Sequence, residues 1–239
     1  MIKHICILIP AKNEEKLLPR CLYSIINATQ LLPKSIHTDI ICCVDSSSDN
    51  TFKIAQNIIG PQGIVLEISE GNVGFARRYA TEEALNRYQG SLEACWLANT
   101  DADCEVPKNW LANHILWANQ GTHALAGIVK VDSYSEHESQ VPELFQNQYI
   151  IYEDDSHPHI HGANLGIRAD VYLRTGGWKP LVTAEDHDLW NRMKTLSLNL
   201  KSHADCFVIT SGRKQGRAPH GFAEKLTSFN GRNYGQFRE

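Results

Sequence analysis

Asp101 and Asp103 are the residues whose type and spacing most directly suggest chemistry, because they flank the small Ala102 just after a short apolar segment. Residues two apart in an extended segment point the same way, so both carboxylates would face one side. Mg²⁺ and Mn²⁺ are commonly held by one or two carboxylates together with phosphate oxygens of a substrate. Such a cation would act as a Lewis acid toward a departing diphosphate. The pair predicts a divalent-metal site, and the alternative is that the two aspartates form a turn.

A second acidic pair, Glu185 and Asp186, stands at the start of a helix that is predicted to run to Leu196. The positive end of a helix dipole favours an ionised carboxylate. An ionised carboxylate can act as a general base. The alternative is an acidic residue that stabilises the helix N-terminus, and the pair taken alone fits that structural role better.

The elements that position these residues alternate between apolar and amphipathic segments in the first half of the chain. This pattern predicts parallel strands joined by helices in an α/β fold. In such a sheet the ligand crevice lies at the carboxyl ends of the strands, and polar residues follow each predicted strand here. The expected strands are 4–10, 40–44, 63–68 and 94–98, and the expected helices are 14–28, 51–59 and 74–88.

The second half of the chain alternates less regularly, and its end is basic and rich in glycine. Residues 211–219 are predicted to form a mobile loop, and 221–239 a poorly determined tail. The loop's arginines and lysine could fold over a diphosphate as a lid, or they could be a solvated surface charge run. The other expected elements are helices 107–119 and 143–153 and strands 124–131, 165–168 and 204–210.

Composition narrows the class of protein. A hydrophobic share of 42% and a charged share of 21% are typical of a globular chain, and a net charge of -4 argues against a nucleic-acid partner. We expect a soluble chain without an export signal or a transmembrane segment, with peripheral membrane contact still possible. The seven cysteines include no C-x-x-C pair, which favours buried thiols in a reducing cytoplasm and argues against a zinc site.

Five segments in order resemble glycosyltransferase family 2, a group with the GT-A fold. Five motifs in the correct order are more specific than any one of them. The resemblance implies a Rossmann-like, mostly parallel sheet flanked by helices, in a single domain 1–239 of two abutting lobes. These would be a nucleotide-binding lobe 1–104 and an acceptor lobe 105–239 with a flexible basic C-terminal segment. The matching segments are 9–15 (I-P-A-K-N-E-E), 44–51 (V-D-S-S-S-D-N-T), 72–77 (N-V-G-F-A-R), 101–103 (D-A-D) and 185–186 (E-D).

The resemblance also implies an activity: transfer of a sugar from a UDP- or GDP-linked donor to an acceptor hydroxyl, with Mn²⁺ or Mg²⁺ and with inversion. Asp186 would be the catalytic base, with Glu185 beside it as the other candidate for acid and base work. Asp103 would bind the metal, and His220 is a candidate for the further ligand that relatives place near the last strand. The implied donor-binding residues are Pro10, Ala11 and Glu14 around base and ribose, Asp45 on the base, Arg77 near the diphosphate, Asp101, and Asn164 on sugar hydroxyls.

Two other functions are open to this sequence. A sugar nucleotidyltransferase would use a related sheet, but such enzymes usually begin with a G-x-G-x-R loop, and residues 10–13 are unlike it. An inactive nucleotide-sugar binding protein would be expected to lose Asp103 or Asp186, and both are present. The acceptor and the oligomeric state are not predicted. If the transferase interpretation is right, the carboxylates of Asp45, Asp103 and Asp186 should meet around one cavity.

Overall fold

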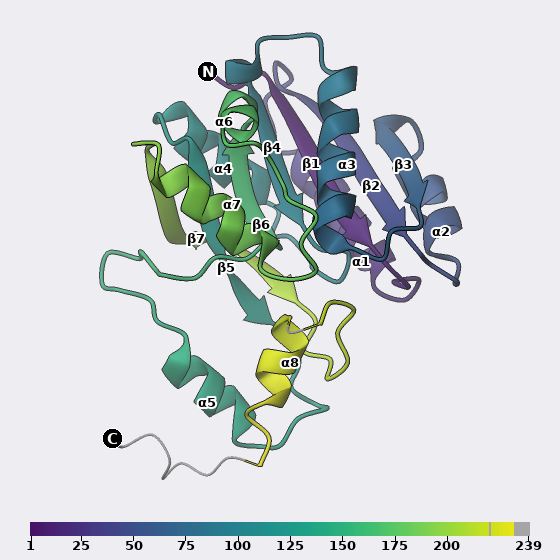
Figure 1. Cartoon of the computed structure of the whole chain (residues 1–239), viewed down its shortest axis with the longest axis vertical. Helices are drawn as coiled ribbons and strands as arrows, with labels where there is room; N and C mark the ends of the chain where they lie inside the picture. The colour runs from purple at the N-terminus through teal and green to yellow at the C-terminus, as the bar shows by residue number, and fades with distance from the viewer. Residues whose placement is uncertain (220, 232–239) are drawn as a thin grey trace.

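A computed structural model describes residues 1–219 and 221–231. Across these residues, seven strands form one sheet in the order β3-β2-β1-β4-β6-β5-β7 (Figure 1). Neighbouring strands are parallel except at β6, which runs antiparallel between β4 and β5. The predicted mostly parallel α/β sheet is therefore confirmed. The strands are β1 (His4–Ala11), β2 (His37–Asp45), β3 (Gly63–Ile68), β4 (Cys95–Thr100), β5 (Ala124–Val131), β6 (Asn164–Arg168) and β7 (Leu200–Thr210).

Helices cover both faces of the sheet. One face packs against α1 (Leu18–Thr29), α2 (Thr51–Ile59) and α4 (Trp110–Asn119). The other packs against α3 (Val73–Arg87), α6 (Ala169–Arg174) and α7 (Glu185–Lys194). Side chains along β1 alternate between the two faces, with Ile7 in one core and Leu8 in the other. Burial on both faces explains why this strand is a continuous apolar run in the sequence.

Two further helices form a small apolar cluster outside the main core. α5 (Val141–Gln148) and α8 (Phe222–Thr227) lie beyond the carboxyl end of β5 in Figure 1. Phe145 of α5 and Leu226 of α8 belong to this third cluster, and Phe222 packs against it. The cluster holds the segment after β7 near the edge of the sheet, so a helix forms over Phe222–Thr227, where the poorly determined tail was expected to begin. Residues 232–239 of that expected tail lie outside the described residues.

Several element boundaries differ from the expected ones. α1 begins at Leu18 and not at residue 14, because Pro19 suits the first turn of a helix and residues 14–17 form a turn closed by the Glu14 carbonyl. α5 ends at Gln148, five residues before the expected end. The short α6 and α8 were not predicted, and a single turn or two of helix gives little periodic signal. No helix in the described part of the chain has the length and apolarity to span a membrane.

Candidate active site

The carboxyl ends of the six parallel strands meet at one edge of the sheet, as the topology requires. Because β6 runs the other way, the residues that precede it, 161–163, also come to this edge. Two adjoining cavities open there, and they share a wall that includes Val73, Asp101 and Phe222.

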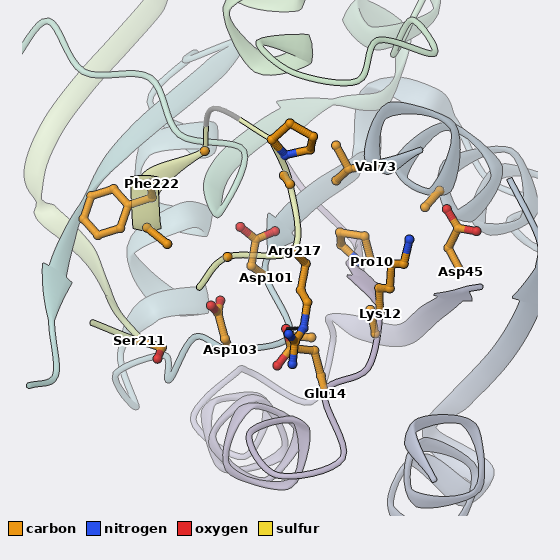
Figure 2. A pocket seen from close by; sticks show the side chains of 18 of the residues that line it. Pro10, Lys12, Glu14, Asp45, Val73, Asp101, Asp103, Ser211, Arg217 and Phe222 are labelled. Atoms are coloured by element: carbon orange, nitrogen blue, oxygen red, sulfur yellow. Dashed lines mark ion pairs between the residues drawn. The ribbon is translucent and has the colours of Figure 1, made fainter. Parts of the chain in front are cut away.

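The first cavity lies between the ends of β1, β2 and β4 and the segment after β7. Figure 2 shows Asp45 beyond Lys12 toward one end of it and Asp103 near Ser211 toward the other. The structure thus brings together six of the predicted site residues. These are Pro10, Ala11, Glu14, Asp45, Asp101 and Asp103, and all of them line the first cavity.

The second cavity holds the other acidic pair. Its wall includes Arg77, Glu185 and Asp186, together with His161 and Gly162 from the segment before β6. Our expectation that Asp45, Asp103 and Asp186 would line a single cavity is therefore wrong. Asp186 faces the second cavity, because α7 begins on the far side of the wall that Asp101 forms.

Asp186 is oriented by two backbone amides. Its Oδ2 accepts a hydrogen bond of 2.7 Å from Gly162 N–H, and its Oδ1 accepts one of 2.7 Å from His187 N–H. Ala184, the residue before this acidic pair, has a left-handed backbone with φ of 58°. Such a conformation is uncommon for a residue other than glycine and tends to occur at functional sites. The turn aims the acidic pair into the cavity.

Asp45 fixes the loop that joins β3 to α3. Its Oδ1 accepts hydrogen bonds from Glu70 N–H and Gly71 N–H, at 2.9 and 2.8 Å, and its Oδ2 accepts one of 2.7 Å from Asn72 N–H. Burial raises the pKa of Asp45, but these bonds and one from the Ser46 hydroxyl lower it more, so the net shift is downward. The carboxylate therefore holds this loop, and its predicted contact with a base stays a prediction.

Asp45→Asn is expected to lower the free energy of unfolding by about 2 kcal/mol at neutral pH, because an amide cannot accept all of these hydrogen bonds. A lowered folded-state pKa means that the wild-type advantage is present above the ordinary value of 3.8 and is lost as the pH falls through the folded value. Urea unfolding at pH 7 and at pH 3 measures this difference. Glu67→Gln, an exposed change on β3, is the control. A penalty that does not shrink in acid would contradict the assignment.

The basic segment after β7 turns into the first cavity. Arg213 forms a forked pair with Glu14, at 2.8 and 2.6 Å, and its Nη2 lies 2.9 Å from Asp103 Oδ2. Arg217 donates a hydrogen bond of 2.8 Å to the carbonyl of Asn13 and lies 3.6 Å from Glu14. A forked guanidinium–carboxylate pair is strong and directional. Both arginines line the first cavity. The alternative of a solvated charge run does not describe Arg213, whose side chain is mostly buried, whereas Arg217 is exposed.

Asp101 and Asp103 are the carboxylates that could hold a cation. Burial raises the pKa of Asp103 above its usual range, the charge of Arg213 opposes that shift, and Asp101 and Glu14 add to it. Over residues 1–219 and 221–231, no group of three or more His, Cys, Asp or Glu side chains is arranged to hold a metal. His220, the further candidate ligand, lies outside the described residues. The donor set fits a cation that takes its remaining ligands from a diphosphate.

Arg77 has different partners from the predicted ones. Its side chain is 2% exposed, Nη2 lies 2.6 Å from Asp101 and Nε lies 3.2 Å from Glu185. Burial lowers the pKa of Arg77, but Asp101, Glu185 and Asp186 raise it more. Burial also raises the pKa of Glu185, and Arg77 opposes that shift. In this arrangement the guanidinium binds two carboxylates, and its predicted contact with a diphosphate stays a prediction.

Asn164 is a correction to the predicted site. Its side chain is fully buried. Oδ1 accepts a hydrogen bond from Trp110 Nε1 at 2.9 Å, and Nδ2 donates to the carbonyls of Ile128 and Cys206 at 2.9 and 3.0 Å. These bonds tie β6 to its neighbours. We therefore remove Asn164 from the residues expected to bind a sugar.

The sequence analysis missed three contributors to the site: the pairing of Arg213 with Glu14, the amide of Gly162, and His161. Strand direction could have indicated the first, because a segment that follows a parallel strand reaches the same edge as the acidic residues. His161 lines the second cavity, and its Nε2 is hydrogen-bonded to the hydroxyl of Tyr149 at 2.9 Å. Burial, helped by His159 and Lys225, lowers the pKa of His161 to about 3, so the ring is uncharged at neutral pH.

The fold is the GT-A fold, which the solved structures of two glycosyltransferases share. The chain belongs to glycosyl transferase family 2, because the model of the family described as "Glycosyl transferase family 2" matches residues 6–176. The resemblance stated from the sequence is thereby confirmed. A comparison with curated protein sequences gave no match.

Two solved structures illustrate the likeness. S. aureus TarS in complex with UDP-GlcNAc superposes with a TM-score of 0.67 at 14% identity, over 92% of this chain and 61% of that one. The Pyrobaculum calidifontis mannosyltransferase PcManGT, in complex with GDP-Man and Mn²⁺, gives 0.65 at 19% identity, over 91% of this chain and 59% of that one. The chain thus matches about three fifths of each of these structures. At these identities the likeness supports the shared fold.

Proposed function

We propose that this glycosyltransferase is metal-dependent and inverting, and that it moves a sugar from a UDP- or GDP-linked donor to an acceptor hydroxyl. One observation carries the proposal: two cavities share a wall, and between them they are lined by the carboxylates proposed to hold a cation, Asp101 and Asp103, and by the proposed base, Asp186. The relatives support the donor class, since TarS was solved with UDP-GlcNAc and PcManGT with GDP-Man and Mn²⁺.

In the first cavity, Pro10, Ala11 and Glu14 border the nucleotide, and Asp45 holds the loop beside it. Asp103 and Asp101 would hold the cation, which when bound neutralises charge on the leaving diphosphate. Arg213 is paired with Asp103 and must leave that carboxylate before the donor binds. Once released, its guanidinium can pair with diphosphate oxygens, and the segment can close over them and exclude water.

In the second cavity, Asp186 acts as the general base. The acceptor oxygen forms a bond to the anomeric carbon while the bond from that carbon to the diphosphate oxygen breaks on the opposite face. The acceptor proton passes to the carboxylate of Asp186. The amides of Gly162 and His187 keep this carboxylate in place during the transfer.

The seven free thiols of the chain, all of them buried, support a further part of the proposal, a reducing cytoplasmic location. The two lobes, 1–104 and 105–239, are likewise proposed as the donor and acceptor parts of one domain.

A thermal-shift panel of UDP-, GDP- and dTDP-linked sugars, each with and without Mn²⁺, tests the proposed function. A ligand at 100 times its Kd stabilises a protein by about 2.7 kcal/mol, which corresponds to a rise in Tm of about 5–10 °C for a chain of this size. We expect one nucleotide class to give this rise in the presence of Mn²⁺ and little without it. If none of these sugars moves the Tm under either condition, the proposed donor site is wrong.

A further inference from the structure

The buried guanidinium of Arg77 links a carboxylate that lines both cavities to one that lines the second. Arg77 on α3 contacts Asp101, which lines both cavities, and Glu185, which lines the second one. These two carboxylates come from the end of β4 and the start of α7, and they are far apart in the sequence. The relative position of the cation carboxylates and the base therefore depends on the side chain between them.

A third contact extends this link to Asp186 itself. A Cβ atom placed on Gly162 would lie 2.6 Å from Arg77 Nη2, so the backbone of Gly162 packs directly against the guanidinium. The N–H of the same Gly162 donates the hydrogen bond to Asp186 Oδ2. Arg77 thus supports the base by two routes, through Glu185 at the start of the helix and through the amide that orients the carboxylate.

The burial of Arg77 also argues that its role is more than stabilisation. The guanidinium carbon lies 5.5 Å from the ring centroid of the buried Trp178. Within the part of the chain that the structure describes, Nη1 is buried without a hydrogen-bond partner. Buried ion pairs often add little net stability, because desolvation offsets the attraction, and their best-attested use is to specify one arrangement.

Building on the proposed function, we propose that Arg77 is a positioning residue that sets the distance and orientation between Asp101 and Asp186. It acts through its two carboxylate partners and through Gly162, without contact to the substrate. A lysine cannot replace it, because one ammonium group lacks the planar fork that reaches both carboxylates.

The test compares Arg77→Lys, Arg77→Ala and Gly162→Ala with Arg78→Lys. Arg78 is the next residue on α3, is half exposed and pairs with Glu82, so it is a matched control. The assay follows release of UDP from UDP-GlcNAc and of GDP from GDP-mannose with Mn²⁺, with water standing in for the acceptor. Loss of a residue that orients a metal or its ligands typically costs about 10–100-fold in activity. We expect Arg77→Lys to lower kcat by about this factor with KM changed by less than about threefold.

Two measurements separate positioning from a structural role. Gly162→Ala keeps every charge but displaces the guanidinium, so it is expected to lower kcat in the same way while the protein stays folded. Millimolar guanidinium chloride, below denaturing concentrations, is expected to restore part of the kcat of Arg77→Ala and none of that of Arg77→Lys. Arg78→Lys is expected to match the wild type.

The outcomes distinguish this inference from the function it rests on. If the wild type releases neither nucleotide, the proposed function fails and the positioning role with it. If the wild type is active and both Arg77→Lys and Gly162→Ala keep its kcat, the positioning role alone is overturned. A lowered Tm with unchanged kcat in the folded fraction, and no guanidinium rescue, also overturns it.

Discussion

Asp186→Asn is expected to lower kcat for sugar transfer by roughly 10³-fold, because general-base catalysis typically contributes about 10²–10⁴-fold. An amide cannot take the acceptor proton. Its NH₂ group would also face the N–H of Gly162 or of His187, where the wild-type carboxylate accepts hydrogen bonds. The dissociation constant of the donor should change little, since Asp186 lines the second cavity and the nucleotide is assigned to the first.

Asp188→Asn is the matched control for this effect. Asp188 lies on the same helix and pairs with Lys179 at 3.2 Å and with Arg192 at 2.7 Å. We expect its kcat to stay near that of the wild type. Nucleotide release and isothermal titration of the donor measure the two quantities. A kcat of Asp186→Asn close to that of Asp188→Asn would remove Asp186 from the mechanism.

Asp103→Asn has the second large expected effect, a loss of about 100-fold in the Mn²⁺-dependent affinity for the donor. A neutral amide is a poor ligand for a hard cation, and Asp101 alone would have to hold it. The Tm of the free protein should not fall much, because burial already disfavours the charged form of Asp103.

Glu105→Gln is the control for Asp103→Asn, since Glu105 lies two residues after Asp103. Its carboxylate pairs with Arg20, and Oε2 of Glu105 lies 4.0 Å from Nε of Arg20. Its donor affinity with Mn²⁺ should equal that of the wild type. Equal affinities for Asp103→Asn and Glu105→Gln would show that Asp103 is not a metal ligand.

The strand ends could be predicted from the sequence because they depend on local pattern. The apolar run before Asp101 and the polar turn after it are continuous in the sequence, so this strand end can be recognised locally. Parallel topology then places the carboxyl ends of the strands at one edge of the sheet. For this reason Glu14, Asp45 and Asp103 were expected to come together, and they line one cavity. The five motifs that resemble family 2 indicated the same strand ends in the same order, without use of the hydrophobic periodicity.

The pairings between side chains could not be predicted in the same way. Arg213 and Glu14 are 199 positions apart, and Arg77 and Glu185 are 108 apart, so no local pattern links them. The antiparallel direction of β6 decides that Gly162 faces the site while Asn164 lies in the core. A strand of five residues gives no signal of its direction, and the role assigned to Asn164 was wrong for that reason.

The division into two cavities has a similar cause. The start of α7 is placed by the loop before it, which packs on the first turn of α3: a Cβ on Gly74 would lie 2.3 Å from the carbonyl oxygen of Lys179. This close approach depends on the tertiary fold. It places Asp186 in the second cavity, and Arg77, which contacts Asp101 directly, is linked to Asp186 through Glu185 and Gly162.

Electron paramagnetic resonance of Mn²⁺ tests most directly whether Asp101 and Asp103 share one cation with a nucleotide diphosphate. Free Mn²⁺ is measured in the presence of the wild-type protein, of Asp103→Asn and of buffer, each with and without UDP or GDP. We predict that one of these nucleotides lowers the free Mn²⁺ signal far more with the wild type than in buffer, and that Asp103→Asn abolishes the difference. A wild-type signal equal to that of nucleotide in buffer would contradict the shared cation site.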